Sequence, residues 1–149
     1  MRVAVACDHA GFPGKEAVCR RLRALGHEVV DVGVCSTDPV DYPDIATAAC
    51  IAVREGRAER AVILCGSGAG AAIVANKHAG IRAAVCHDTY SAHQVVEHDD
   101  VNVLCLGARV VGPALIDELV AAFVGARFTG EERHVRRLEK IHLLDRGWA

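Results

Sequence analysis

Short apolar runs alternate along the whole chain with longer segments whose apolar residues recur at helical spacing. Strands are predicted at residues 3–7, 28–32, 61–65, 82–86 and 101–106. Helices are predicted at residues 15–25, 44–55, from a glycine-rich loop to about 76, 89–97, 113–124 and 131–146. Short buried strands that alternate with helices are typical of a parallel sheet covered on both faces. The pattern therefore predicts an α/β fold built on a parallel sheet of five strands.

The composition agrees with one small domain. A length of 149 residues suits a single α/β unit, and an apolar content of 52% is enough for a core. The net charge of −2 gives no general reason to expect nucleic acid or a membrane surface as a partner. The apolar run after Arg2 is too short for a secretory signal, and no stretch is long enough to cross a bilayer. We therefore expect residues 1–149 to form one soluble, cytoplasmic domain.

The last predicted helix, at residues 131–146, has two different sides. Most of its residues are charged, which is typical of a solvated face. Apolar residues also recur along it at helical spacing, at Val135, Leu138, Ile141 and Leu144. Because the chain is short, we expect this apolar side to pack on a second subunit.

The seven cysteines are not spaced for a disulfide framework or a zinc site. Their number is odd, and no two of them form a Cys-x-x-Cys motif. Most are therefore interpreted as small apolar core residues. The exception is Cys65, which ends a predicted strand directly before the glycine-rich loop.

Polar residues follow the predicted strands at one end of the sheet. In an open parallel sheet, ligands bind beyond the carboxyl ends of the strands. The polar and glycine-rich positions predicted at that end are Asp8, His9, the loop 65–70, His87, Asp88 and Arg109.

The loop from Gly66 to Ala71 has two interpretations. It fits the pattern G-x-G-x-x-A between a strand and a helix, and Asp88 lies about twenty residues further on, as in a dinucleotide-binding fingerprint. Against that interpretation, the loop follows the third strand instead of the first, and no room remains for a substrate domain. The alternative is a loop whose free backbone N–H groups bind a developing oxyanion.

Cys65 favours the second interpretation. A helix N-terminus favours the thiolate form of a nearby cysteine, and a thiolate can remove a proton from carbon. The adjacent N–H groups and the Ser67 hydroxyl could then stabilise an enolate oxygen. A base beside an oxyanion hole is what proton abstraction next to a carbonyl requires.

Segments along nearly the whole chain resemble the ribose-5-phosphate isomerase B family, within the wider group that includes the galactose-6-phosphate isomerase subunits. The matching segments are Cys7-Asp8-His9-Ala10-Gly11-Phe12, Asp41-Tyr42-Pro43-Asp44, Cys65-Gly66-Ser67-Gly68-Ala69-Gly70, Ala75-Asn76-Lys77, Gly80-Ile81-Arg82-Ala83, Asn102-Val103-Leu104, Gly107-Ala108-Arg109-Val110-Val111-Gly112 and Arg133-His134. They occur in the family's order, which makes them far more specific than the glycine loop alone.

The resemblance implies a fold, a reaction and an assembly. The implied fold is a Rossmann-like three-layer sandwich. The implied reaction interconverts ribose 5-phosphate and ribulose 5-phosphate through a cis-enediolate, without a metal or other cofactor. The implied assembly is a homodimer, or a dimer of dimers, with each site shared between subunits.

The resemblance also implies roles for individual residues. Cys65 would move the proton between C2 and C1, Ser67 would hold the intermediate, and His98 would open the furanose ring with the help of Asp8. The residues implied to bind the substrate are His9, Tyr42, Gly66, Gly68, Ala69, Gly70, Asp99, Arg109, Arg133, His134 and Arg137. Convergent arginines also suit a phosphate on physical grounds.

Several of these positions have a simpler interpretation, and one departs from the family. Asp8 could cap the turn after the first strand, and His98 could belong to a solvated helix end. The family usually has Asn where this chain has Asp99, so a donor amide becomes an acceptor-only carboxylate. A hexose 6-phosphate or a tetrose 4-phosphate therefore stays open as the substrate.

Overall fold

The computed structural model describes residues 1–145, so Arg146 of the last predicted helix lies outside the described residues. The strands are β1 (Arg2–Cys7), β2 (Glu28–Asp31), β3 (Arg60–Cys65), β4 (Ala83–Val85) and β5 (Val103–Gly107). The helices are α1 (Phe12–Ala24), α2 (Tyr42–Arg54), α3 (Ala69–Ala75), α4 (Thr89–Asp99), α5 (Pro113–Gly125) and α6 (Glu132–Leu144).

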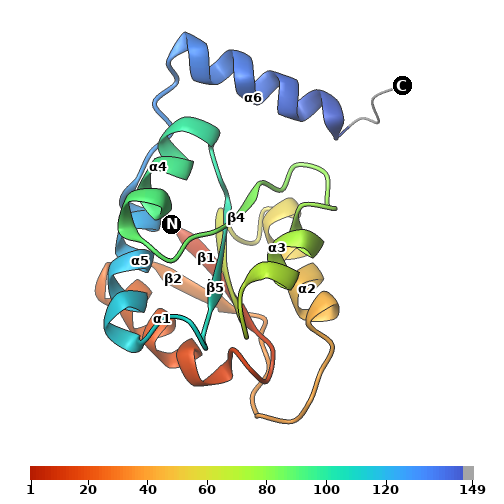
Figure 1. Cartoon of the computed structure of the whole chain (residues 1–149), viewed down its shortest axis with the longest axis vertical. Coiled ribbons are helices and arrows are strands. Elements are labelled where there is room, and N and C mark those ends of the chain that lie inside the picture. Colours follow the sequence, from red (N-terminus) through yellow and green to blue (C-terminus); the bar gives the residue numbers. More distant parts are fainter. Residues whose placement is uncertain (146–149) are drawn as a thin grey trace.

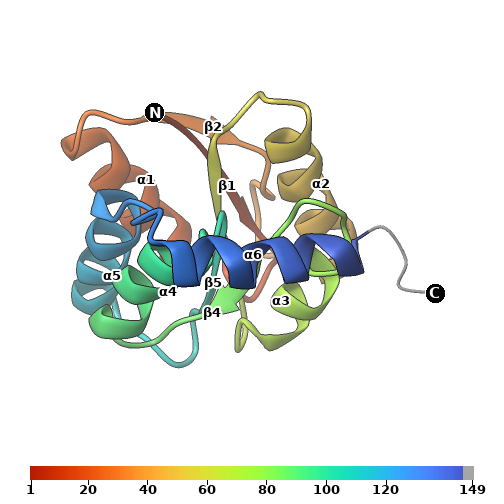
Figure 2. The same cartoon turned by 90° about the horizontal axis from the view of Figure 1, so that it is seen from above.

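The five strands form one parallel sheet in the order β2-β1-β3-β5-β4. Helices α1, α4 and α5 cover one face of the sheet, and α2 and α3 cover the other (Figures 1 and 2). The predicted three-layer α/β sandwich is therefore confirmed. The chain leaves β1 first toward β2 and then toward β3, so the strand order reverses between β1 and β3. In this fold class, a crevice opens at the carboxyl ends of such a strand pair.

The two faces of the sheet are packed with side chains of different size. Large residues such as Leu22, Leu119 and Phe123 fill the face under α1, α4 and α5. The face under α2 and α3 is built mainly from alanine and cysteine, including Ala49 and Cys50. Small side chains allow α2 and α3 to approach the sheet closely. The loop between β3 and α3 is therefore held near the strand ends.

Helix α1 begins three residues earlier than predicted. The Oδ1 atom of Asp8 accepts the Gly11 N–H at 2.8 Å, and the Asp8 carbonyl accepts the Phe12 N–H at 2.9 Å. Pro13, in the first helical turn, has no N–H to satisfy. These contacts start the helix immediately after β1, and they fix the turn that follows the strand.

Helix α6 lies across the amino ends of the strands, away from the loops at their carboxyl ends (Figure 1). His134 is its only buried residue within the described part of the chain. On the predicted apolar side, Val135, Ile141 and Leu144 are 37–57% exposed and Leu138 is half-buried. This side of the helix is therefore largely uncovered in the single chain. Among the described residues, no helix is long and apolar enough to span a membrane.

Candidate active site

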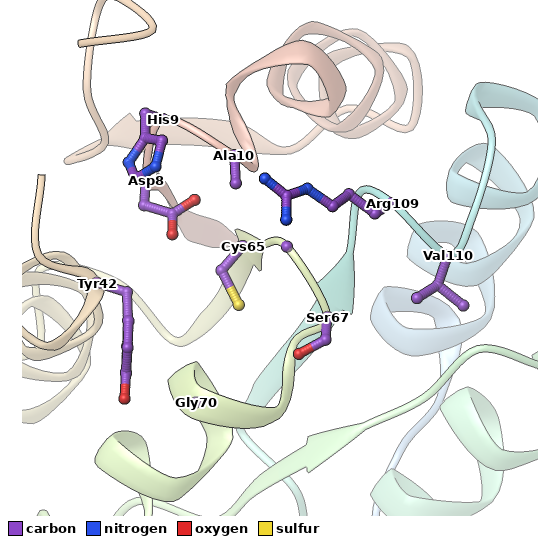
Figure 3. A pocket seen from close by; sticks show the side chains of 10 residues that line it. Asp8, His9, Ala10, Tyr42, Cys65, Ser67, Gly70, Arg109 and Val110 are labelled. Atoms are coloured by element: carbon purple, nitrogen blue, oxygen red, sulfur yellow. The ribbon is translucent and has the colours of Figure 1, made fainter. Parts of the chain in front are cut away.

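A pocket of about 430 Å³ lies at the carboxyl ends of β1 and β3, where the strand order reverses. Figure 3 shows that Asp8, Cys65, Ser67 and Arg109 point into this space from three different loops. The residues that line it are Asp8, His9, Ala10, Tyr42, Cys65, Gly66, Ser67, Gly70, Arg109 and Val110. Eight of these ten were predicted as site residues from the sequence.

Cys65 is the last residue of β3, and its side chain is only 5% exposed. Its Sγ accepts the N–H of Gly68 at 3.1 Å. Gly68 can turn its amide back toward the sulfur because its φ of 83° lies in the left-handed region, which glycine adopts without strain. The loop therefore supplies a hydrogen-bond donor to the candidate base itself.

Ser67 and Tyr42 line the pocket on either side of the loop's first helical turn, at Ser67 before it and against Gly70 within it. The Ser67 Oγ accepts the Ala69 N–H at 3.3 Å, so the hydroxyl hydrogen stays free to donate to a ligand. The Tyr42 ring lies against Gly70, where an added Cβ would meet the ring at 2.8 Å. Glycine at position 70 therefore makes room for the tyrosine beside the loop. Gly68 and Ala69, which were also predicted as site residues, do not line the pocket, and their N–H groups donate to Cys65 Sγ and Ser67 Oγ.

Asp8 and His9 extend from the turn after β1. The Asp8 side chain is 5% exposed and does cap the turn through its Oδ1, as its simpler interpretation predicted. Its carboxylate also faces the pocket (Figure 3). The His9 Nδ1 accepts the Val40 N–H at 3.2 Å, so a neutral His9 ring carries its proton on Nε2. His9 can therefore donate a hydrogen bond from Nε2.

Arg109 brings the positive charge of the pocket from the segment after β5. The N–H groups of Ala108 and Arg109 donate to the carbonyls of Cys65 and Gly66 at 2.9 and 3.1 Å. The guanidinium lies against Gly66, where an added Cβ would meet Nη1 at 3.7 Å. The same short segment thus holds the glycine loop and carries the cation.

The other buried cysteines lie in environments that disfavour the thiolate. Burial raises the pKa of the Cys7, Cys50 and Cys86 thiols to about 11, and it also raises the pKa of Cys105. None of these four lines the pocket. Their interpretation as core residues is consistent with this environment.

Asp88 and His87 lie near the pocket but do not line it. The Asp88 Oδ1 accepts the Ser91 N–H at 2.7 Å and caps α4, and this hydrogen bonding lowers the pKa of Asp88. The Nε2 atom of His87 accepts the Gly107 N–H at 3.0 Å. Asp88 is therefore used in a helix cap, which weakens the dinucleotide interpretation.

Five predicted site residues lie at the opposite end of the sheet. The residues that the structure does not bring to the pocket are His98, Asp99, Arg133, His134 and Arg137. The His98 and His134 rings stack with centroids 4.2 Å apart, and the His98 Nδ1 lies 2.6 Å from the Gln94 Nε2. His134 is 2% exposed, and neither of its ring nitrogens has a hydrogen-bond partner among the described residues. Arg133 and Arg137 are exposed on α6.

Two pocket residues, Ala10 and Val110, were missed by the sequence reasoning. They carry no chemical group that would single them out. Each directly follows a predicted site residue, His9 or Arg109, and this adjacency was the available signal.

The chain is similar over nearly its whole length to known proteins. A family model described as Ribose/Galactose Isomerase matches residues 3–141. The chain is 42% identical over 144 residues to "Ribose-5-phosphate isomerase B" of Escherichia coli, covering 97% of this chain and 96% of that protein. It is 40% identical over 132 residues to "D-erythrulose-4-phosphate isomerase" of Pectobacterium atrosepticum, covering 87% and 86%. The solved type B ribose 5-phosphate isomerase of Trypanosoma brucei superposes with a TM-score of 0.93 at 44% identity, covering 96% and 97%.

Proposed function

The chain belongs to the ribose/galactose isomerase family and is a sugar-phosphate aldose–ketose isomerase, and we propose that it interconverts ribose 5-phosphate and ribulose 5-phosphate. The observation that carries this proposal is the position of Cys65. Its sulfur lies in a pocket with Asp8, Ser67 and Arg109, at the end of a loop whose Gly68 N–H already points at it. This is the arrangement that proton transfer beside a carbonyl requires.

In the proposed reaction, the Cys65 thiolate removes the proton from C2 of the open-chain aldose. The C–H electrons form the C1=C2 bond, and the carbonyl oxygen at C1 takes up the negative charge of a cis-enediolate. Ser67 and N–H groups of the loop hold this intermediate. Cys65 then returns the proton to C1, the O2–H electrons form the C2=O bond, and the O2 proton passes to O1, which gives the ketose. No atom or electron is gained or lost overall.

Recognition of the phosphate is assigned to cationic groups. Arg109 lies in the pocket, and His9 can donate from Nε2. Arg133 and Arg137 would add two further guanidinium groups, and arginine forms charge-assisted bonds to phosphate oxygens in pairs. The family resemblance implies that His134 binds the substrate. Because His134 is buried and its ring stacks on His98, it would act on the substrate indirectly, by holding His98. Since charged sugar phosphates do not cross bilayers, we also place the enzyme in the cytoplasm.

We propose that the complete site forms between two chains. The ring-opening residue His98, together with Asp99, Arg133 and Arg137, lies at the amino end of the sheet, away from the pocket of the same chain. Helix α6 also exposes an apolar side there. A two-fold dimer that covers this apolar side would bring these four residues of each chain to the pocket of the partner chain. The assembly is then a homodimer or a dimer of such dimers.

A four-carbon substrate is the second candidate. It is favoured by relatives named D-erythrulose-4-phosphate isomerase. One of them, from Mycolicibacterium smegmatis, is 40% identical and covers 95% of this chain. Asp99, in place of the family's usual Asn, could alter contacts to a sugar hydroxyl because a carboxylate only accepts hydrogen bonds.

The test is a substrate panel with purified protein. Ribose 5-phosphate, D-erythrulose 4-phosphate and an aldohexose 6-phosphate are each followed by NMR in D₂O, which also records exchange of the proton beside the carbonyl. The proposal predicts the highest kcat/KM for ribose 5-phosphate. A higher value for D-erythrulose 4-phosphate would replace it with the second candidate, and Asp99→Asn would then show whether this position sets the preference.

A further inference from the structure

The His87 ring accepts a hydrogen bond from the backbone next to the loop that carries Cys65. Its half-buried ring follows β4, and Nε2 accepts the N–H of Gly107, the last residue of β5, at 3.0 Å. Strand β4 pairs with β5 only from Ala83 to Val85. The Gly107 N–H therefore lies beyond the paired part of β4, and the imidazole supplies the acceptor that a longer strand would have supplied.

Gly107 lies directly against the loop that carries the candidate base. An added Cβ at Gly107 would meet the Ser67 backbone at 2.8 Å. The next two residues, Ala108 and Arg109, donate their N–H groups to the carbonyls of Cys65 and Gly66. A shift of Gly107 would therefore be transmitted to the sulfur, the Ser67 hydroxyl and the Arg109 guanidinium together.

We propose that His87 is a positioning residue for the isomerase site, acting through Gly107 on the loop from Cys65 to Ser67. It does not line the pocket, so it acts on the substrate only through this backbone. The inference rests on the proposed function for its kinetic consequence, but the contact itself can be tested without any substrate. The acceptor role needs a neutral ring with its proton on Nδ1.

The experiment compares three variants of the full chain. His87→Leu removes the acceptor and keeps the bulk, whereas His87→Gln places an amide oxygen near the position of Nε2. His93→Leu, on the exposed surface of α4, is the matched control for loss of a histidine. For each variant, NMR measures hydrogen exchange at the Gly107 amide, and steady-state assays measure kcat and KM.

We expect His87→Leu to speed exchange at the Gly107 amide and to lower kcat by roughly tenfold, with a smaller change in KM, because small misplacements of reacting groups are costly. His87→Gln should recover most of both losses, and His93→Leu should change neither. The inference is overturned if His87→Leu leaves Gly107 as protected as in the wild type. It is equally overturned if kcat falls as far in His87→Gln as in His87→Leu. If no sugar phosphate is isomerised by the wild type, the proposed function fails, while the exchange rates still decide the contact.

Discussion

At the carboxyl end of the sheet, the reactive side chains stand on short loops whose backbone is hydrogen-bonded to neighbouring loops. At the amino end, they stand on α4 and α6, which meet through the stacked rings of His98 and His134. The first region forms a pocket within one chain, and the second does not reach it. In our proposal, one chain therefore supplies the groups for proton transfer at carbon, whereas ring opening and part of the phosphate recognition need a second chain.

Removal of the proposed base at the carboxyl end of the sheet should cause the largest loss of isomerase activity. Cys65→Ala should lower isomerase activity by about 10²- to 10⁴-fold, the usual contribution of a general base, because no other cysteine lines the pocket. NMR in D₂O should show that exchange of the substrate proton is lost as well. Cys50→Ala, a buried thiol on the same face of the sheet, is the matched control and should keep nearly full activity. Comparable losses in the two variants would remove Cys65 from the mechanism.

His98, at the amino end of the sheet, should matter mainly for ring-closed substrates. His98→Leu should slow the reaction of ribose 5-phosphate by about 10²-fold, in the range of an acid–base group. Ribulose 5-phosphate cannot close to a furanose, so exchange of its C1 proton with D₂O, which needs no ring opening, should be much less affected. NMR of ribulose 5-phosphate in D₂O measures this exchange beside the rate of isomerisation. An equal loss of exchange and isomerisation would place His98 in the proton-transfer step instead.

The two ends should contribute similarly to phosphate binding. Arg109→Met and Arg137→Met should each raise KM by about 10- to 100-fold, the size expected for one lost charge-assisted contact. Arg136→Met removes an exposed charge from the same helix as Arg137 and serves as the control. If Arg137→Met behaves like Arg136→Met, the amino end does not bind the phosphate.

The rate of alkylation by iodoacetamide should differ between Cys65 in the pocket and the cysteines in the core. Because burial raises the pKa of Cys7, Cys50 and Cys86 to about 11, only about one in a thousand of each is thiolate at pH 8. That fraction rises about tenfold per pH unit until the pKa is reached. Mass spectrometry should find iodoacetamide at the exposed Cys35 and at Cys65 first. Ribose 5-phosphate should slow the modification of Cys65 severalfold and leave Cys35 unchanged, and equal protection of both would argue against a ligand beside Cys65.

Much of the fold followed from the sequence because the strands are short apolar runs with clear breaks. The limits of the elements depended on contacts between distant residues. Strand β4 is shorter than predicted partly because the Arg82 N–H bonds to the Asn102 Oδ1 at 2.9 Å instead of extending the sheet. The early start of α1 required the Asp8 side chain at Gly11. Such side-chain contacts with the backbone are not visible in a hydrophobic pattern.

Part of the site was predictable because the order of the strands brings its residues together. Asp8, Cys65 and Arg109 follow neighbouring strands of a parallel sheet, so their meeting follows from topology. His98 lies near the far end of α4, about 14 Å along the helix from Thr89 at 1.5 Å per residue. The contact of His87 with Gly107 depends on where β4 stops pairing, and the sequence pattern predicted a longer strand.

The most direct measurement of a site shared between chains is complementation between two inactive variants. Cys65→Ala and His98→Leu are mixed in equal amounts, unfolded and refolded together, and assayed with ribose 5-phosphate. Random dimers would be half hybrids, each with one intact site and one doubly altered site, so activity should return to about a quarter of the wild-type value. Activity that stays at the level of the two variants assayed separately would contradict a site built from the carboxyl end of one chain and the amino end of another.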